Sequence, residues 1–292
     1  MMHKPLLLAL ALLTSIASAE SRIEKIKQNK TITVGYMSDD LPFSYTNDKG
    51  EYLGFSVAIT HKVTESIAKE LGIDNLKVEI KPITFQNRFS MMQSGELDFS
   101  CSAHSNLPER KEWVDFSHNF FTARGRLIVR TDSGIESYKD LAGKKVALIS
   151  DTSLADVIPR KRTQFKFEEP MTVNSGDELL ELLRNRTVDG IFDDDIMVMA
   201  KIAKNNETEQ FKMIGQALAL EHYACIVPKG DVEMKKLVDQ ALFQLFTSGD
   251  IEPIFKQWFQ EPMPYLNINL NFELTPAVKS LYTNPNDKSI GE

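Results

Sequence analysis

The feature that most constrains the fold is a strand–helix rhythm that runs along the chain and then restarts. Residues 31–36 form a β-branched run typical of a strand, and residues 54–72 repeat apolar side chains four apart, as an amphipathic helix does. A strand at 76–83, a short helix and a strand at 96–103 complete the first set. Strands that alternate with helices are typical of a parallel sheet. This part of the chain therefore predicts an α/β unit.

The pattern begins again beyond the aromatic stretch at 116–130. Residues 144–149 read as a buried strand, and Ser175 is placed to cap a helix that leads into a strand ending at Asp193–Asp195. Residues 222–259 add a further strand followed by two helices. Since no low-complexity linker separates the two sets, we predict two α/β units and a late return of the chain to the first.

The amino terminus is typical of a secretory signal peptide. Lys4 precedes an apolar run at 6–13 and a small-residue segment, so we expect cleavage between Ala19 and Glu20. The apolar run is too short to span a bilayer. The formal net charge is −7 and the lysines are scattered, so the chain has no basic stripe for nucleic acid. We expect a soluble protein that is exported.

The two cysteines of the sequence are Cys101 and Cys225. In an exported chain such a pair usually forms a disulfide, although either can be a buried, inert thiol. The histidines lack the spacing of a metal site, and three consecutive aspartates point in different directions, which makes a poor calcium site. The sequence has no nucleophile elbow, P-loop or dinucleotide fingerprint. We expect no cofactor, no metal and no catalysis.

Polar residues gather where three of the predicted strands end: Ser102–Arg110, Ser150–Ser153 and Asp193–Asp195. In an open parallel sheet, ligands lie beyond the carboxyl ends of the strands. Hydroxyls, an arginine and a helix start can bind a carboxylate, and an acid can bind an ammonium group. Together the three ends predict a site for a zwitterion. Each end also has a simpler reading, as a surface arginine, plain helix caps or solvated acids.

Arg88 lies in the segment PITFQNRFSMM, among phenylalanines and methionines. An arginine held in apolar surroundings must meet an anion or bear a large desolvation cost. The ordinary alternatives are that it reaches the surface or pairs with a nearby aspartate. Which anion it meets is the main question that the sequence raises.

An ordered series of segments runs through the chain: TVGY, LPFSY, GFSVAI, PITFQNR, GELDFSCSA, NLPERKEWVDFS, SYKDLAGKKVA, VDGIFDDD, KQWF and LNINLNFEL. This series resembles the periplasmic solute-binding proteins of amino-acid ABC transporters, and it is most similar to their glutamate/aspartate-binding branch. The resemblance implies an α/β fold of type II, in which two hinge strands join two lobes. Lobe one would comprise residues 20–121 and 222–292, and lobe two residues 122–221. Cys225 would then lie near Cys101, which strengthens the disulfide prediction.

The resemblance also implies a role for individual residues. Arg110 matches the arginine that binds the ligand α-carboxylate, and Ser105 would assist it. Either Thr152 or Ser153 would assist from lobe two. Asp193 matches the acid that receives the α-ammonium group.

Other positions concern the ligand side chain or depart from the pattern. Ala103 stands where a ligand-contacting serine is usual, so only its backbone could serve. Arg88 matches an arginine that binds a side-chain carboxylate in the acidic-ligand branch. That branch has a second arginine where this chain has Met37, a serine where it has Phe85, and a histidine where it has Ser175.

These departures leave the ligand open. The pocket could still take glutamate or aspartate through one arginine, or it could have shifted to a neutral polar or larger apolar amino acid. In either case Arg88 could instead pair with Asp39 or Asp40 and close the pocket floor.

We therefore expect a monomeric binding protein of the periplasm that captures an amino acid by closure of its lobes and delivers it to a membrane ABC permease. One rival is a periplasmic enzyme on the same fold, such as a cyclohexadienyl or arogenate dehydratase. It would need an acid or base in the pocket, for which Asp194 and Asp195 are candidates, although a solvated acid is the simpler reading of both. The other rival is a protein that presents its ligand to a membrane receptor.

Overall fold

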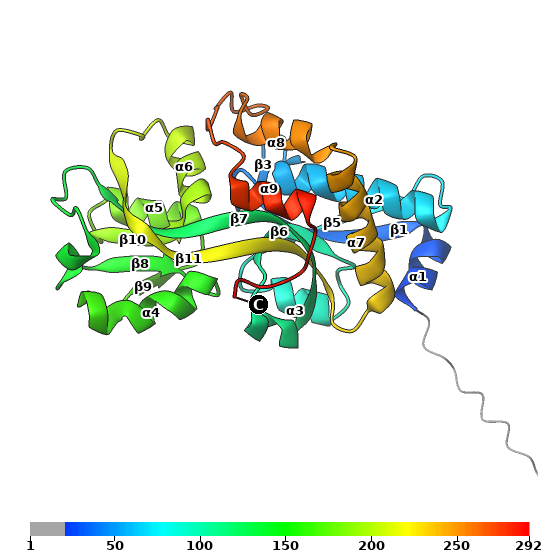
Figure 1. Ribbon diagram of the computed structural model, residues 1–292, viewed down its shortest axis with the longest axis horizontal. Helices are drawn as coiled ribbons and strands as arrows, with labels where there is room; N and C mark the ends of the chain where they lie inside the picture. Colours follow the sequence, from blue (N-terminus) through cyan, green and yellow to red (C-terminus); the bar gives the residue numbers. More distant parts are fainter. Residues whose placement is uncertain (1–20, 292) are drawn as a thin grey trace, which may run out of the picture.

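The computed structural model describes residues 21–291, so the predicted signal peptide lies outside the described residues. Two groups of helices and strands stand at the two ends of the molecule and are joined by two long strands (Figure 1). These strands are β7 (Val114–Arg130) and β11 (Phe211–Pro228), which pair antiparallel along most of their length. Because both strands belong to the sheets of both groups, the predicted two-lobe α/β fold is confirmed.

In lobe one, the parallel pair β1 (Thr31–Met37) and β5 (Lys77–Ile83) lies beside β6 (Ser100–Ser105), which pairs antiparallel with β11. A bridge between Val34 and Phe99 joins β1 to the segment just before β6. The other elements of this lobe are α1 (Arg22–Asn29), β2 (Asp39–Asp40), β3 (Ser44–Thr46), β4 (Tyr52–Leu53), α2 (Phe55–Leu71), α3 (Arg88–Gln93), η1 (Pro108–Glu112), α7 (Val232–Thr247), α8 (Ile251–Phe259) and α9 (Pro276–Thr283).

In lobe two, the sheet has the order β11-β7-β10-β8-β9. The strand β10 pairs parallel with β8 but antiparallel with β7, so the sheet is mixed where the sequence predicted a parallel one. The reason is that one hinge strand enters the lobe and the other leaves it, so the two must run in opposite directions. The other elements are η2 (Tyr138–Leu141), β8 (Val146–Ile149), α4 (Ser153–Phe165), β9 (Met171–Val173), α5 (Gly176–Arg184), β10 (Gly190–Asp194) and α6 (Asp195–Lys204).

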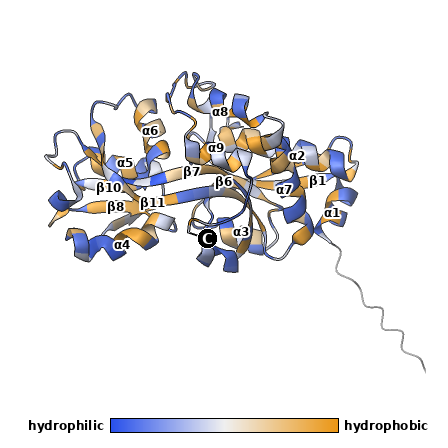
Figure 2. Cartoon of the chain, viewed as in Figure 1, coloured by the Kyte–Doolittle hydropathy of each residue, from blue (hydrophilic) through white to orange (hydrophobic). Residues whose placement is uncertain are grey.

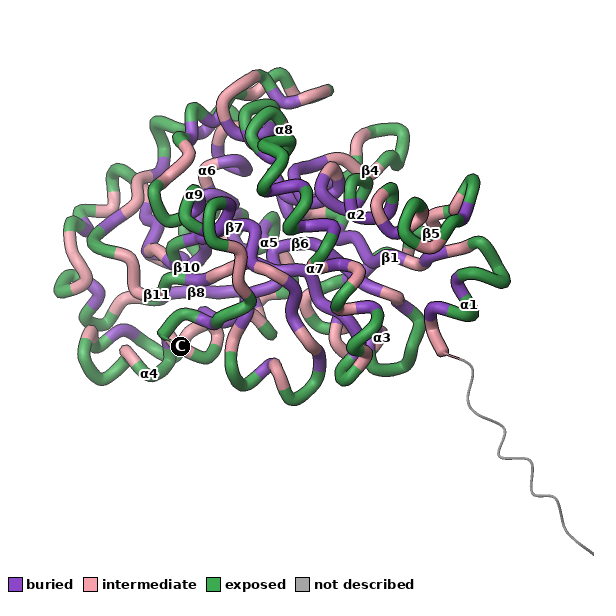
Figure 3. The backbone as a smooth tube through the Cα atoms, turned by 45° about the vertical axis from the view of Figure 1, so that its right-hand side comes forward, coloured by how far each residue is buried: buried purple, intermediate pink, exposed green. Residues whose placement is uncertain are grey.

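Side chains of β7 show that the sheet of lobe two is buried on both faces. Leu127 and Val129 pack in one apolar cluster, and Ile128 between them packs in another. This period of two is that of a strand. The central strands are mainly apolar and buried, and the outer faces of the helices are polar and exposed (Figures 2 and 3).

A disulfide joins Cys101 on β6 to Cys225 on β11, which face each other in the strand register. The disulfide prediction is therefore confirmed. The predicted lobe boundaries at 121/122 and 221/222 fall inside β7 and β11, and they stay a prediction. Within residues 21–291, no helix has both the length and the apolar character needed to cross a membrane.

Candidate functional site

A cavity lies between the lobes, where β6 and β10 end and α4 begins. The open space at its centre is about 20 Å³, roughly the space of one water-sized sphere, so the lobes are closed against each other here. All the residues that the sequence assigned to ligand binding line it, except Met37 and Ser175. We call it the central cavity, and its lining is Phe85, Arg88, Ala103, Ser105, Arg110, Thr152, Ser153, Leu154, Asp193, Asp194, Met197 and Tyr223.

Arg110 reaches the central cavity from the single turn η1 and is buried. Its Nη1 donates to the carbonyl oxygen of Ser105 at 3.3 Å, and its Nη2 donates to that of Asp151, from the other lobe, at 3.4 Å. Both hydrogen bonds are long for a guanidinium, and burial lowers the pKa of Arg110. A buried cation with such weak partners is well placed to receive an anion.

Arg88 begins helix α3 and is 1% exposed. Its Nη1 donates to the carbonyl oxygen of Phe85, and its Nη2 donates across the lobes to that of Asp151 at 2.8 Å. The guanidinium carbon lies 4.3 Å from the centroid of the Phe89 ring. Burial, and then repulsion by Arg110, lower the pKa of Arg88 to about 9. Both terminal nitrogens of Arg88 are thus used by backbone carbonyls and an aromatic ring covers its guanidinium.

Arg88 forms neither of the ion pairs that the sequence allowed. Asp39 pairs with Lys201 of lobe two, and Asp40 accepts a hydrogen bond from Ser102 Oγ at 3.1 Å. Asp40 still lies close enough for its charge to raise the pKa of Arg88, against the larger effect of burial, which lowers it. The anion is therefore near Arg88 without bonding to it.

The amino-terminal end of α4 faces the central cavity. Thr152 caps this helix by accepting a hydrogen bond from the Ala155 N–H at 3.4 Å, which confirms the helix-cap reading of its side chain. The carboxylate of Glu221 accepts hydrogen bonds from Ser153 Oγ and, at 2.5 Å, from Ser105 Oγ. Glu221 lies on the hinge strand β11, so it links hydroxyl groups of both lobes.

The three consecutive aspartates after β10 have different surroundings. Asp193 Oδ1 accepts the backbone N–H of Asp194 at 2.9 Å, and burial raises the pKa of Asp193 to about 7. Asp194 accepts a hydrogen bond from the Tyr223 hydroxyl, but its Oδ1 is buried with no partner among the described residues. Burial raises the pKa of Asp194 well above its ordinary value. Asp195 instead pairs with Arg124 at 2.6 Å.

Sequence reasoning did not assign Asp194, Glu221 or Tyr223 to the ligand site. Strand alternation cannot choose among three identical neighbours, so it gave no reason to single out Asp194. Glu221 and Tyr223 are two apart on β11, hence on the same face of the strand. An acid just ahead of a buried apolar run was the signal that could have indicated Glu221.

A second interlobe space, which we call the distal cavity, lies beside the central one and has a volume of about 100 Å³. Phe85 lines both cavities. Met37 and Ser175 line the distal cavity from opposite lobes, so the three positions that depart from the glutamate/aspartate-binding branch meet around one space. The full lining is Met37, Ser38, Asp39, Asp40, Ile83, Thr84, Phe85, Asn174, Ser175 and Gly176.

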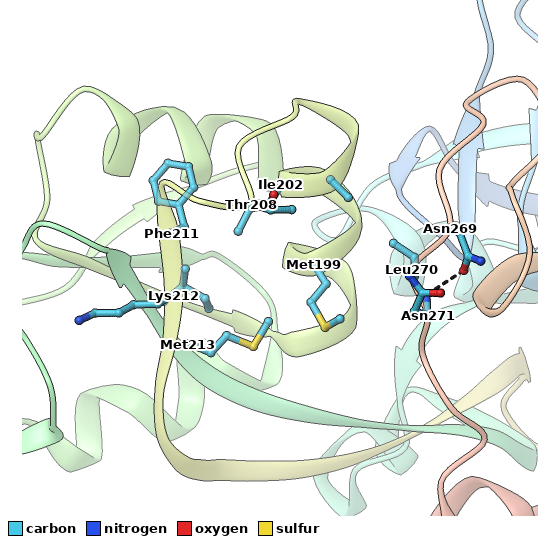
Figure 4. A pocket seen from close by; sticks show the side chains of 11 residues that line it. Met199, Ile202, Thr208, Phe211, Lys212, Met213, Asn269, Leu270 and Asn271 are labelled. Carbon is cyan, nitrogen blue, oxygen red and sulfur yellow. Dashed lines mark hydrogen bonds between the residues drawn. The ribbon is translucent and has the colours of Figure 1, made fainter.

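A third cavity, of about 310 Å³, lies between α6, the start of β11 and the segment 269–271 (Figure 4). Apolar side chains such as Met199, Ile202 and Phe211 dominate it. None of the assigned ligand residues lines it. Within residues 21–291, no group of three or more His, Cys, Asp or Glu side chains could hold a metal ion.

Comparisons with known proteins agree with this geometry. Residues 32–261 match the family model of the bacterial extracellular solute-binding proteins, family 3. A glutamate/aspartate import solute-binding protein of Escherichia coli is 32% identical over 97% of this chain and 97% of its own.

Two solved structures are similar as well. An ancestral arginine-binding protein bound to glutamine has a TM-score of 0.68 and 28% identity, over 80% of this chain and 99% of its own. An ancestral amino acid-binding protein, described as a precursor of cyclohexadienyl dehydratase, has a TM-score of 0.69 and 27% identity over 82% and 99%. The fold, the interlobe cavity and these matches together establish that the chain belongs to family 3 of the bacterial extracellular solute-binding proteins.

Proposed function

We propose that this protein captures an α-amino acid between its lobes in the periplasm and, as a monomer, delivers it to an ABC permease. Its family and its relatives support this, because the curated relatives are named as importers and binding proteins of amino acids rather than enzymes. The observation that carries the proposal is the convergence on one closed cavity of a buried arginine, two serine hydroxyls and an acid with an unpartnered oxygen.

In this proposal the ligand α-carboxylate lies against Arg110, Ser105 and the start of α4. The long hydrogen bonds from Arg110 to backbone carbonyls give way to shorter bonds to a carboxylate, in which both the donor and the acceptor are charged. The unpaired N–H groups of a helix start favour the same anion. The carboxylate of Glu221, which accepts from Ser105 and Ser153 in the closed structure, supports the view that these hydroxyls suit a carboxylate.

The ligand ammonium group lies against Asp194, with Asp193 beside it. Oδ1 of Asp194 is buried and unpartnered in the described structure, and an ammonium group supplies the donor that it lacks. We prefer Asp194 to Asp193, the acid that the resemblance favoured. Each accepts one hydrogen bond, but only Asp194 of the two has a buried oxygen without a partner in the described structure. A bound cation also lowers the pKa of buried carboxyl groups and so keeps both acids charged.

Closure of the lobes brings together the groups that bind the two charged ends of the ligand. Gln86 Nε2 of lobe one already donates to Ser150 Oγ of lobe two at 2.9 Å. A ligand held by Arg110 from lobe one and by Asp194 from lobe two adds bonds that exist only when the lobes meet. It therefore shifts the equilibrium toward the closed form. The paired strands β7 and β11 are the hinge about which the lobes move, and the closed form is the one that the permease recognises.

The test is calorimetric titration of the refolded, ligand-stripped protein without its first 19 residues, with each of the twenty amino acids. We expect at least one of them to bind at one to one with a dissociation constant below about 10 μM, and to be recovered unchanged. Absence of binding by all twenty contradicts the proposal. Recovery of a chemically altered ligand contradicts it too, and favours an enzyme on the same fold.

A further inference from the structure

The distal cavity is the place for the ligand side chain. In the proposed function, the α-carboxylate and α-ammonium groups are held by Arg110 and Asp194 in the central cavity. Only about 20 Å³ is open there, whereas about 100 Å³ is open on the far side of Phe85. Water occupies about 30 Å³ per molecule, so the distal cavity has room for a side-chain end of a few heavy atoms.

The lining of the distal cavity does not suit a carboxylate. Two acids, Asp39 and Asp40, are part of it, and none of its lining residues is a cation. Arg88 lines the central cavity instead, and its terminal nitrogens donate to the carbonyls of Phe85 and Asp151. A ligand carboxylate there would lose its water, gain no fixed cation and lie beside two acids, which is costly.

A cationic side chain is also disfavoured. Asp39 already has a counter-ion, because Lys201 pairs with it across the lobes and also pairs with Asp177 at 2.9 Å. Lys201 is 3% exposed, so this charge is screened little by water. A second cation beside Asp39 would be repelled by Lys201. Lys201 thus already occupies the place beside Asp39 that a cationic side chain would take.

An apolar side chain would leave hydrogen-bonding capacity of the lining unused. Asp40 accepts from Ser102 Oγ, and Ser175 Oγ accepts from the Glu178 N–H. The second oxygen of Asp40, the side-chain amide of Asn174 and the proton of the Ser175 hydroxyl form no bond among the described residues. A buried polar group that loses water and gains no partner costs about 1–3 kcal/mol in proteins generally. A ligand group with both donors and acceptors satisfies such a wall. Because carboxylate oxygens of the wall can only accept hydrogen bonds, the donors of the ligand side chain contribute most.

We infer that the distal cavity selects an amino acid with a neutral side chain that donates hydrogen bonds, of the carboxamide class, over the isosteric carboxylate. This inference rests on the proposed function, since it assumes that the α-amino and α-carboxyl groups lie in the central cavity. Phe85 separates the two cavities and so sets the length of side chain that reaches the polar wall.

The test uses pairs of ligands that differ in charge but not in size. The ligand-stripped protein is titrated with glutamine and glutamate, with asparagine and aspartate, and with methionine as an apolar side chain of similar length. We expect one amide to bind at least about tenfold more tightly than its acid and more tightly than methionine. An acid that binds as tightly as its amide overturns the inference, and so does tighter binding of methionine.

A variant sharpens the result. Met37→Arg adds a cation to the distal cavity, so it should lower the ratio of amide to acid affinity at least about tenfold. Met171→Arg adds the same charge at an exposed site that lines neither cavity, so it should leave that ratio unchanged. An unchanged ratio in a folded Met37→Arg protein overturns the inference. If that variant does not fold, the wild-type ligand pairs decide alone. Tight binding of an acid refutes only this inference, whereas failure of all twenty amino acids refutes the proposed function.

Discussion

The two interlobe cavities differ in how their charged groups are satisfied. In the central cavity, Arg110 has only long hydrogen bonds to backbone oxygens, and Asp194 has a buried oxygen with no partner in the described structure. In the distal cavity, Asp39 is already paired with Lys201. One cavity therefore has charged groups free to meet those of a ligand, whereas in the other Asp39 already has a counter-ion.

In our proposal the two cavities recognise different parts of the ligand. Every α-amino acid carries the same carboxylate and ammonium groups, so the central cavity can be the same for any of them. Only the side chain differs between ligands, and we propose that the distal cavity contacts it. Changes at Met37, Phe85 and Ser175 can then alter the ligand while Arg110 and Asp194 are kept. The predictions below test whether the α-amino and α-carboxyl groups are recognised independently of the side chain.

The largest effect should come from Arg110→Ala, which removes the arginine of the central cavity that has only long hydrogen bonds. Truncating one partner of a buried charge pair costs several kcal/mol, so we expect affinity for every amino acid to fall at least about a hundredfold. Calorimetry against the wild-type ligand measures this. Arg186→Ala is the matched control, because Arg186 is exposed and pairs with Asp132 at the surface. Affinity within about tenfold of wild type would refute the carboxylate role of Arg110.

Asp194→Asn should have the next largest effect, because it removes the charge that faces the ammonium group but keeps the shape. We expect about tenfold to a hundredfold weaker binding. The neighbouring substitution Asp195→Asn is the control: it breaks the ion pair with Arg124, so it should lower Tm more than affinity. The reverse pattern, with Asp194→Asn harmless to binding, would return the ammonium role to Asp193.

A smaller effect is expected for Lys201→Met, which removes the interlobe ion pair with Asp39 but touches no ligand in our proposal. The closed form loses one of its supports, so affinity for the neutral amino acids should fall about threefold to tenfold, with the ranking among them unchanged. Lys204→Met, at an exposed site of the same helix, should change nothing. A changed ranking among the neutral amino acids would mean that Lys201 acts inside the distal cavity as well as on closure.

The smallest effect should be a pH dependence of the stability of the unliganded protein. Burial raises the pKa of Asp193 and Asp40 to about 7, from an ordinary value of 3.8. Between these values the folded state holds protons that the unfolded state has lost. The free energy of unfolding therefore falls as pH rises through this window. We expect Tm to be lower at pH 8 than at pH 5, and the slope to shrink in Asp193→Asn but not in the exposed control Asp132→Asn. An equal slope in both variants would contradict this.

The sequence allowed much of the fold to be predicted, because apolar periodicity follows from which face of an element is buried. The strand ends indicated the segments Ser102–Arg110 and Ser150–Ser153, because parallel sheets hold ligands there, and these segments do meet at the central cavity. The roles of Arg110, Ser105 and Ser153 within them came from the family resemblance and stay predictions. Glu221 was not assigned because its partners are brought to it by the hinge, 116 and 68 residues away along the chain. The pairing of Asp39 with Lys201, 162 residues apart, depends likewise on closure of the lobes.

The disulfide has a practical consequence for following the motion of the lobes. Cys101 and Cys225 are the two cysteines of the sequence, and both are used in this bond. A single engineered cysteine at Gln86 or Ser150, which touch across the lobes, would therefore be the one reactive thiol. An environment-sensitive dye attached there would report ligand capture as a change in fluorescence. The native bond thus leaves the chain ready for conversion into an optical sensor.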